Sequence, residues 1–151
     1  MVKLITVEQI AVYKQITTNL NSVKVLDPHI LAAQDLDLRP FLGDELFLDL
    51  LNDFEASPSL SDYSDLYNGS TYTFESRTYD HPGIVAVLSA FTYARYVAFS
   101  NVASTKSGFV KKTNSEDSEL LTDKTISNMV QQAKSTAIVY QERVKLFLDR
   151  N

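Results

Sequence analysis

The longest apolar run of the chain lies between His81 and Lys112, and its spacing predicts a central helix. The run opens with Pro82 and Gly83 and continues for more than twenty residues without a further Pro or Gly. One stripe at helical spacing is wholly apolar and consists of Ile84, Val87, Leu88, Phe91, Ala94, Ala98 and Val102. Other apolar and aromatic residues cover most of the remaining surface, so this helix requires neighbours on several sides.

Two shorter helices are predicted before residue 40. A T-x-x-Q capping box at Thr6 predicts a first helix over about residues 7–19. Asp27 followed by Pro28 is typical of an N-cap with proline at the first helical position, which starts a second helix. Pro40 should kink or stop that helix, because proline lacks the N–H that a helix interior needs.

A third helix and a small hairpin are predicted before the central helix. Residues 41–54 place apolar and acidic side chains on opposite faces, as in an amphipathic helix. From about residue 56 to residue 81 the composition changes to Ser, Asp, Tyr and Gly, and Asn68-Gly69 is the strongest hairpin-turn dipeptide of the chain. The alternation of residues 71–74 beside residues 77–79 favours a two-stranded ribbon.

The C-terminal segment is the clearest amphipathic helix. A Lys-rich loop over residues 104–113 and an acidic stretch, NSEDSELLTD, precede it, and such a stretch favours a helix N-terminus. Its apolar face consists of Ile126, Met129, Val130, Ala133, Ala137, Tyr140, Val144, Phe147 and Leu148. We therefore predict one all-α domain over residues 1–151, a helical bundle of four to five helices with long central and C-terminal helices and a small β-hairpin insertion over about residues 56–81.

The composition removes several kinds of chemistry. The chain contains no cysteine, which excludes disulfides, zinc-thiolate sites, iron-sulfur clusters and thiol nucleophiles. Its four glycines lie too far apart for a phosphate-binding loop or a dinucleotide-binding turn. His29 and His81 are the only histidines and lack partners at metal-binding spacing, so structural roles are expected for both. No serine lies in a G-x-S-x-G elbow, and we expect no cofactor and no metal.

Three charged features bear on possible sites. Residues 35–39 match two positions of a calcium loop, but Pro40 stands where the turn glycine belongs, so a solvated helix face explains the run better. With nineteen Asp and Glu residues, a pair of approaching carboxylates carries no information about acid–base catalysis. Arg95 interrupts the apolar helix and needs a partner, either an internal carboxylate, which we favour, or a subunit interface.

The net charge of −5 is unevenly distributed. Residues 1–80 contain thirteen acidic and five basic residues, a balance of −8, whereas residues 81–151 contain six and nine, a balance of +3. An acidic half disfavours a general grip on nucleic acid. It suits a surface past which DNA slides, a surface that meets the basic half of a neighbouring copy, or a solvated acidic face, which is the simplest explanation.

No targeting segment is recognisable. The N-terminal residues contain no apolar run long enough for a signal peptide, and the best membrane-span candidate is interrupted by Thr92, Arg95 and Ser100. We therefore expect no membrane association and a chain that remains in the cytoplasm in which it is made.

Two motifs lie on either side of the hairpin region. The pattern A-Q-x-x-D-[IL]-x-P-x-L-G is matched by Ala33, Gln34, Asp37, Leu38, Pro40, Leu42 and Gly43. The pattern Y-A-R-Y followed by T-x-x-G-[FV]-V-x-K is matched by Tyr93, Ala94, Arg95, Tyr96, Thr105, Gly108, Phe109, Val110 and Lys112. These motifs resemble those of head-to-tail connector proteins of tailed bacteriophages, also called adaptor, head-completion or neck ring proteins, and most closely those of crAss-like and other Bacteroidetes phages.

The resemblance implies a structural virion protein and not an enzyme. Members of that family form a closed ring, commonly a dodecamer, between the portal vertex and the tail. The ring extends the DNA channel and helps to retain the genome, without sequence-specific DNA binding. The implied location is the neck of the virion, with the portal protein and other neck or tail proteins as partners. Ring closure is heterologous, so one face of each copy must match a different face of the next.

We expect the loop over residues 104–113 and the hairpin to contact a neighbouring subunit or the portal. The residues expected at these contacts are Arg95, Lys106, Gly108, Phe109, Val110, Lys111, Lys112, Tyr72 and Phe74. Acidic residues of the first half are expected to line or approach the channel. The alternative is a small helical partner-binding or regulatory protein that acts as a monomer or dimer. An unrecognised hydrolase that uses scattered carboxylates is a more distant third possibility.

Overall fold

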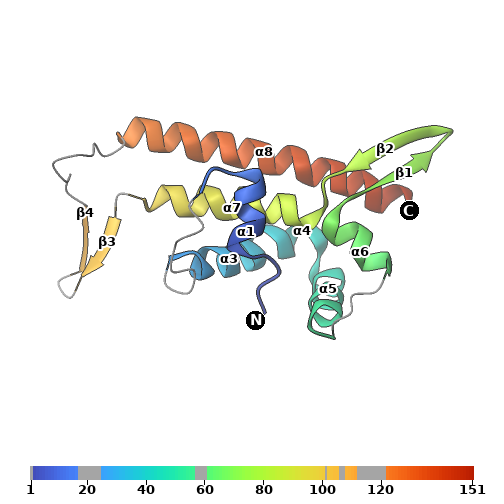
Figure 1. The fold of residues 1–151 in the computed structure, drawn as a ribbon, viewed down its shortest axis with the longest axis horizontal. Helices are drawn as coiled ribbons and strands as arrows, with labels where there is room; N and C mark the ends of the chain where they lie inside the picture. The colour runs from blue at the N-terminus through green and yellow to red at the C-terminus, as the bar shows by residue number, and fades with distance from the viewer. Residues whose placement is uncertain (1, 17–24, 57–60, 101, 106–107, 112–121) are drawn as a thin grey trace.

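The computed structural model describes residues 2–16, 25–56, 61–100, 102–105, 108–111 and 122–151. These residues are mostly helical, which confirms the predicted class, and they include two separate two-stranded antiparallel sheets. Figure 1 shows the long helix α8 running along the molecule, with one hairpin near each of its ends. The elements in chain order are α1 (Val7–Tyr13), α3 (Asp27–Ala33), the π-helical turn η1 (Gln34–Leu38), α4 (Arg39–Leu42), α5 (Asp44–Ala56), α6 (Ser61–Asn68), β1 (Ser70–Phe74), β2 (Arg77–His81), α7 (Gly83–Ala98), β3 (Val102–Thr105), β4 (Gly108–Lys111) and α8 (Asp123–Arg150).

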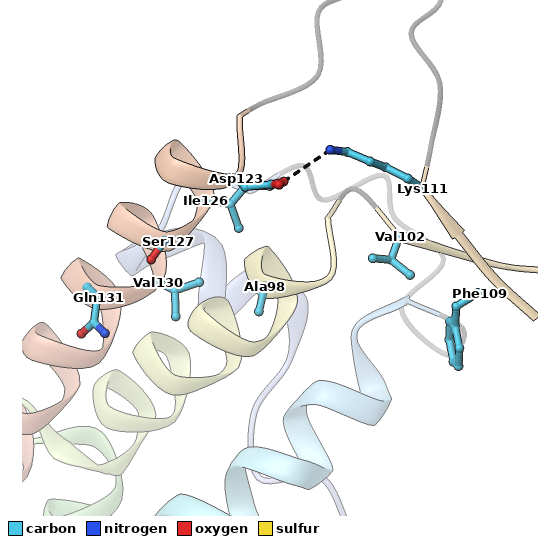
Figure 2. Close-up of a pocket in the computed structure, with 9 residues that line it drawn as sticks. All are labelled: Ala98, Val102, Phe109, Lys111, Asp123, Ile126, Ser127, Val130 and Gln131. Atoms are coloured by element: carbon cyan, nitrogen blue, oxygen red, sulfur yellow. Dashed lines mark hydrogen bonds and ion pairs between the residues drawn. The ribbon is translucent and has the colours of Figure 1, made fainter.

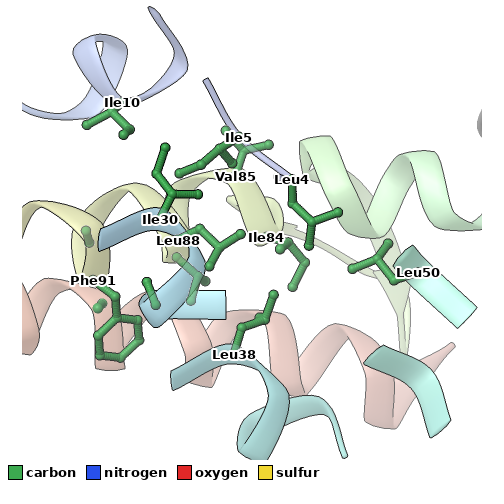
Figure 3. Packing of buried hydrophobic residues seen from close by; sticks show 14 of the residues in the cluster. Leu4, Ile5, Ile10, Ile30, Leu38, Leu50, Ile84, Val85, Leu88 and Phe91 are labelled. Atoms are coloured by element: carbon green, nitrogen blue, oxygen red, sulfur yellow. The ribbon is translucent and has the colours of Figure 1, made fainter. Parts of the chain in front are cut away.

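Helix α7 is the centre of the fold. It contacts α8, α1, α3 and α6, which confirms that its apolar surface needs neighbours on several sides. Its first ten residues, 83–92, are all buried. Figure 3 shows Ile84, Val85 and Leu88 of α7 among apolar side chains from the N-terminal segment and from the helices around it. Burying this many aliphatic side chains is the main favourable term in folding a domain of this size.

Helix α7 is shorter than the sequence pattern predicts. It ends at Ala98, and Val102 lies in strand β3 instead of continuing the helical stripe. The predicted loop over residues 104–113 is also wrong in part, because β3 and β4 form an antiparallel hairpin with Thr105 opposite Gly108. Ser100 and Asn101 are weak helix formers, and the β-branched residues that follow favour a strand.

The N-terminal segment confirms one predicted cap and corrects another. The Thr6 side chain accepts a hydrogen bond from the Gln9 N–H, and the Gln9 side chain bonds back, so the capping box is present. Helix α1 nevertheless ends at Tyr13 instead of residue 19, because Lys14 has extended backbone angles. Asp27 is the first residue of α3 and not its N-cap, which is Leu26, and the Asp27 carboxylate forms an ion pair with Lys3 at 2.7 Å.

A π-helical turn precedes Pro40. The Arg39 N–H donates to the Gln34 carbonyl, five residues back, and this wider spacing accommodates the proline that follows within α4. The helical segment then ends at Gly43, whose φ of +81° favours glycine. The third predicted helix, α5, consequently begins at Asp44 and not at residue 41.

Strands β1 and β2 form the predicted ribbon, but the turn that joins them is not at Asn68-Gly69. The turn consists of Glu75 and Ser76, both with positive φ, as a type I′ turn requires. Gly69 instead packs against the backbone of Pro82 and Gly83 at the base of the ribbon. A Cβ on Gly83 would lie 2.3 Å from the Gly69 nitrogen, so this close backbone contact excludes side chains on both residues.

Helix α8 has the predicted apolar face. Ala133, Ala137 and Val144 are buried, and the other residues of that face are half-buried. Thr122 caps the helix through a hydrogen bond from the Thr125 N–H to its side chain, while residues 114–121 of the acidic stretch lie outside the described residues. Among the described residues, no helix is both long and apolar enough to cross a membrane.

Two polar side chains fix the segment before α4. The Gln34 amide is fully buried, accepting from the Leu4 N–H at 2.7 Å and donating to the Val2 carbonyl at 2.9 Å. The Asp37 carboxylate accepts two hydrogen bonds from Arg95 of α7, from Nε at 2.7 Å and from a terminal nitrogen at 3.1 Å. The expected internal carboxylate partner of Arg95 is therefore confirmed.

His81 joins the ribbon to the end of α8. Its ring is 3% exposed, stacks on Phe147 with the centroids 4.0 Å apart, and lies 3.1 Å from the Ser70 hydroxyl. Burial lowers the pKa of His81 below its ordinary value of 6.5, with a smaller lowering contribution from Arg143. Because the neutral ring is the form that fits this stack, protonation opposes folding.

We expect Gly83→Ala to cost more stability than Gly43→Ala. Both positions have positive φ, but only a Cβ on Gly83 would clash with backbone. The matched control Gly43→Ala should cost about 1–3 kcal/mol for its positive-φ, extended-ψ backbone alone, and Gly83→Ala at least about 2 kcal/mol more through the clash. Urea denaturation measures both variants, and equal losses would show that the Gly69–Gly83 contact is not constrained.

We expect the Asp37–Arg95 pair to matter more than an exposed ion pair. Its side chains are 18% and 29% exposed, so Arg95→Gln should lower the free energy of unfolding by roughly 1–3 kcal/mol, between the values for surface and buried pairs. Arg39→Gln, which breaks the more exposed pairs of Arg39 with Asp35 and Asp44, is the control and should cost less than about 1 kcal/mol. Similar losses in both variants would contradict this ranking.

We expect stability to fall as the pH falls below about 6.5, the ordinary pKa of histidine. The lowered pKa of His81 means that the unfolded chain takes up protons first, so the stabilisation present above that pH is lost below it. Burial also lowers the pKa of His29. His81→Phe should therefore flatten, without abolishing, the decrease in urea midpoint between pH 7.5 and 5.5. An unchanged slope would show that His81 does not contribute.

Candidate functional site

The predicted site residues lie in three separate places. Arg95 lies on α7 in the body of the molecule, the β4 residues lie near one end of α8, and Tyr72 and Phe74 lie on β1 near the other. Lys106 and Lys112 lie outside the described residues. The structure therefore does not gather these residues into one site, and each place must be considered alone.

The Arg95 side chain makes its ion pair within its own chain. Its guanidinium and Asp37 line a small cavity of about 180 Å³, which Phe91, Phe99 and Lys134 also line. Gln141 of α8 donates to the Asp37 carbonyl at 3.5 Å, so this corner connects η1, α7 and α8. The geometry is that of a structural junction between helices.

The β3–β4 hairpin presents an apolar knob. Phe109 is 80% exposed, the highest exposure among the large apolar side chains of the described residues. Lys111 on the same strand forms an ion pair with Asp123 at 3.5 Å, which is the dashed contact in Figure 2. An aromatic ring exposed to this extent offers a large apolar area that a partner can bury.

A groove separates this hairpin from the helices. Its volume is about 520 Å³, and Figure 2 shows Ala98 of α7 and Ile126 and Val130 of α8 on one side, with Val102 and Phe109 on the other. We call this space the hairpin groove. The residues that line this groove are mostly apolar, and its charged side chains, Lys111 and Asp123, form one ion pair.

Tyr72 and Phe74 hold the other hairpin against α8. Tyr72 is only 9% exposed and packs against Phe147 and Tyr79, at centroid distances of 5.4 and 5.6 Å. The Arg150 guanidinium lies 4.7 Å from the Phe74 ring and 4.6 Å from the Tyr79 ring, so it is held by two cation–π contacts. These two predicted site residues thus contact their own chain first.

A second groove, which the sequence did not predict, runs beside β1. It has a volume of about 770 Å³ and is lined by Leu46, Tyr63, Leu66, Phe147 and Leu148 together with residues 70–73. We call it the strand groove. All of its hairpin residues come from β1, and β1 pairs only with β2 among the described strands, so the groove follows the unpaired edge of β1.

The strand groove lies in the most acidic part of the chain. Residues 40–76 contain no Lys or Arg, and their acidic residues are Asp44, Glu45, Asp49, Asp53, Glu55, Asp62, Asp65 and Glu75. Asp65 lines the groove itself. The single-sign charge favours a basic or neutral occupant over an acidic one.

The two histidines are held in ring stacks. His81 belongs to the stack on Phe147, and His29 stacks on Phe99 with the ring centroids 5.9 Å apart. Within the described ranges, no group of three or more His, Cys, Asp or Glu side chains is placed to hold a metal ion. The features that could bind a partner are therefore the exposed Phe109, the hairpin groove and the strand groove.

Comparison with known sequences gives one result. A family described as of unknown function (DUF6712) matches residues 38–151, which is most of the chain. No curated protein and no solved structure matches it. The matched region begins in the π-helical turn and includes α7, both hairpins and α8. The chain belongs to the DUF6712 family.

Proposed function

We propose that the protein is a structural component of a tailed-phage neck, forming a ring, of twelve copies, between the portal and the tail. The observation that carries the proposal is the bidentate pair of Asp37 and Arg95, at 2.7 and 3.1 Å. These residues belong to the two connector-like motifs, which are 58 positions apart at this pair. Two weak motifs that meet in one contact support a shared fold more strongly than either motif alone.

The arrangement of surfaces also supports this function. The knob of Phe109 and the strand groove lie near opposite ends of the molecule, as a head-to-tail contact requires. On this proposal the fold is a bundle of four to five helices with long central and C-terminal helices, and the hairpins are contact elements. No catalytic role, metal or cofactor is part of the proposal.

The acidic half of the chain fits a channel for DNA. Residues 1–80 carry a balance of −8, and a negative wall repels the phosphate backbone instead of binding it. The ring would extend the portal channel, help to retain the genome and let DNA pass without sequence-specific contacts. The location would be the neck of the virion, against the portal protein and other neck or tail proteins.

A second candidate is a partner-binding or regulatory protein that acts as a monomer or dimer. The exposed face of α8 favours it, because Ile138, Val139 and Leu146 are about half exposed on the side away from the core. An apolar patch on one long helix is the kind of surface that a single partner helix could cover.

Electron microscopy of the protein mixed with the portal protein of the same genome separates the two candidates. A connector should give ring-shaped views with about twelve-fold symmetry on the portal, because closed rings of identical copies bury every heterologous contact. A stable monomer that does not bind the portal protein would contradict the proposal. The portal must be present, since a connector can be monomeric alone.

Phe109→Asp should leave the monomer folded and abolish the ring, because the change places a charge on the exposed knob without touching the core. Circular dichroism and urea denaturation check the fold, and electron microscopy checks the ring. The matched control Ile138→Asp changes an equally apolar exposed residue on α8 and should leave the ring intact. The reverse outcome would favour the second candidate.

A further inference from the structure

We propose that the β3–β4 hairpin of one copy docks in the strand groove of a second copy, with Phe109 as its anchor and β1 as its edge partner. This contact rests on the proposed ring function and specifies how neighbouring copies would join. Four observations support it: the exposed knob, the shape and lining of the groove, the charges on both sides, and the positions of the two surfaces.

The knob supplies the apolar part of the contact. Phe109 is 80% exposed, and the hairpin that carries it stands away from the helices in Figure 1. Its backbone belongs to the two-stranded sheet, so the phenyl ring, which lines the hairpin groove and stays open to water, is carried on a short, hydrogen-bonded element. A rigid element that presents an aromatic side chain loses little conformational entropy on docking.

The groove can receive both a side chain and a strand. Its volume of about 770 Å³ exceeds what one phenyl ring fills, and Leu46, Leu66 and Phe147 supply apolar walls. The edge of β1 presents backbone N–H and C=O groups without a strand partner among the described residues. An added strand would satisfy these groups, which is how exposed sheet edges commonly bind extended segments.

The two segments that carry these surfaces have opposite net charges. By sequence, residues 102–113 contain three lysines and no acidic residue, whereas residues 40–76 contain eight acidic residues and no basic one. Lys111 is exposed on β4, and Asp65 lines the groove. Opposite charges at the rim steer the docking and set its orientation, while apolar burial supplies most of the affinity.

The two surfaces cannot meet within one copy. They lie near opposite ends of α8, whose 28 residues span about 42 Å at 1.5 Å per residue. A hairpin must therefore reach the groove of another copy. The knob and the groove are different surfaces, so each copy can bind one neighbour through its knob and another through its groove. Such a contact can repeat from copy to copy until a ring closes.

Disulfide capture tests the contact directly, because the natural chain has no cysteine. Two single-cysteine variants are used, Lys111→Cys on the hairpin and Thr73→Cys on the β1 edge. They are mixed and mildly oxidised, once without portal protein and once with it. Docking should give roughly tenfold more of the 111–73 heterodimer than the control pair of Lys111→Cys with Ser135→Cys on the outer face of α8, because docked thiols have a high effective concentration. Adding Phe109→Asp to the hairpin variant should remove the excess.

A charge reversal in the groove tests the electrostatic part. Asp65→Lys in the Thr73→Cys variant should reduce the yield of the heterodimer roughly two- to fivefold, the size expected of an exposed ion pair, because the Lys111→Cys partner still carries Lys106 and Lys112 in the hairpin segment. Glu142→Lys, an equal charge change on the exposed face of α8, should leave the yield unchanged. If both changes reduced the yield equally, the charge of Asp65 would have no specific role in the contact.

The outcomes separate this contact from the ring function. Rings on the portal without 111–73 capture, or with predominant 111–111 capture, would overturn the hairpin–groove contact and leave the connector function standing. Capture of the 111–73 pair without any binding to portal would retain the contact and overturn the connector function. If the 111–73 pair were captured no more than the Ser135→Cys control pair, both without and with portal, the proposed hairpin–groove contact would be wrong.

Discussion

The burial of α7 on several sides is the constraint on which the rest of the structure depends. A helix with ten consecutive buried residues at its start cannot lie at a surface, so other segments must enclose it. Helices α1 and α3, α6 and α8 do so, and each comes from a different part of the chain. Polar contacts then fix these covering segments, with Gln34 holding residues 2–4 and Asp37 holding Arg95. Apolar burial supplies the driving force, and these hydrogen bonds determine which arrangement results.

Local chemistry was enough to predict the features that depend on neighbours in sequence. The capping box at Thr6, the apolar face of α8 and the need of Arg95 for a carboxylate all follow from spacing or from the cost of burying a charge. The errors lie where tertiary contacts override a local signal. Asn68-Gly69 has ideal turn chemistry, yet Gly69 serves a close backbone contact and the turn falls at Glu75 and Ser76.

The surfaces were harder to predict than the core. Phe109 was among the predicted contact residues, and its exposure agrees with such a role, although the segment around it is a hairpin where a loop was expected. The strand groove was missed because its walls come from α5, α6, β1 and the end of α8. Leu46 and Phe147 fit the apolar faces of two separate predicted helices, and the sequence does not indicate that these faces meet beside β1.

Magnitudes decide how the proposed contact would work. Burying a phenyl ring contributes about 1.5–3 kcal/mol, whereas an exposed ion pair contributes about 0–1 kcal/mol. The Phe109 knob would therefore determine whether two copies associate, and the lysines and acidic residues would determine which faces meet. One such contact is too weak to hold two copies together in dilute solution, since association costs at least about 4 kcal/mol of lost freedom. A ring in which every copy makes the contact twice, on a portal that aligns the copies, lowers that cost, so the contact should be populated more on the portal than between free copies.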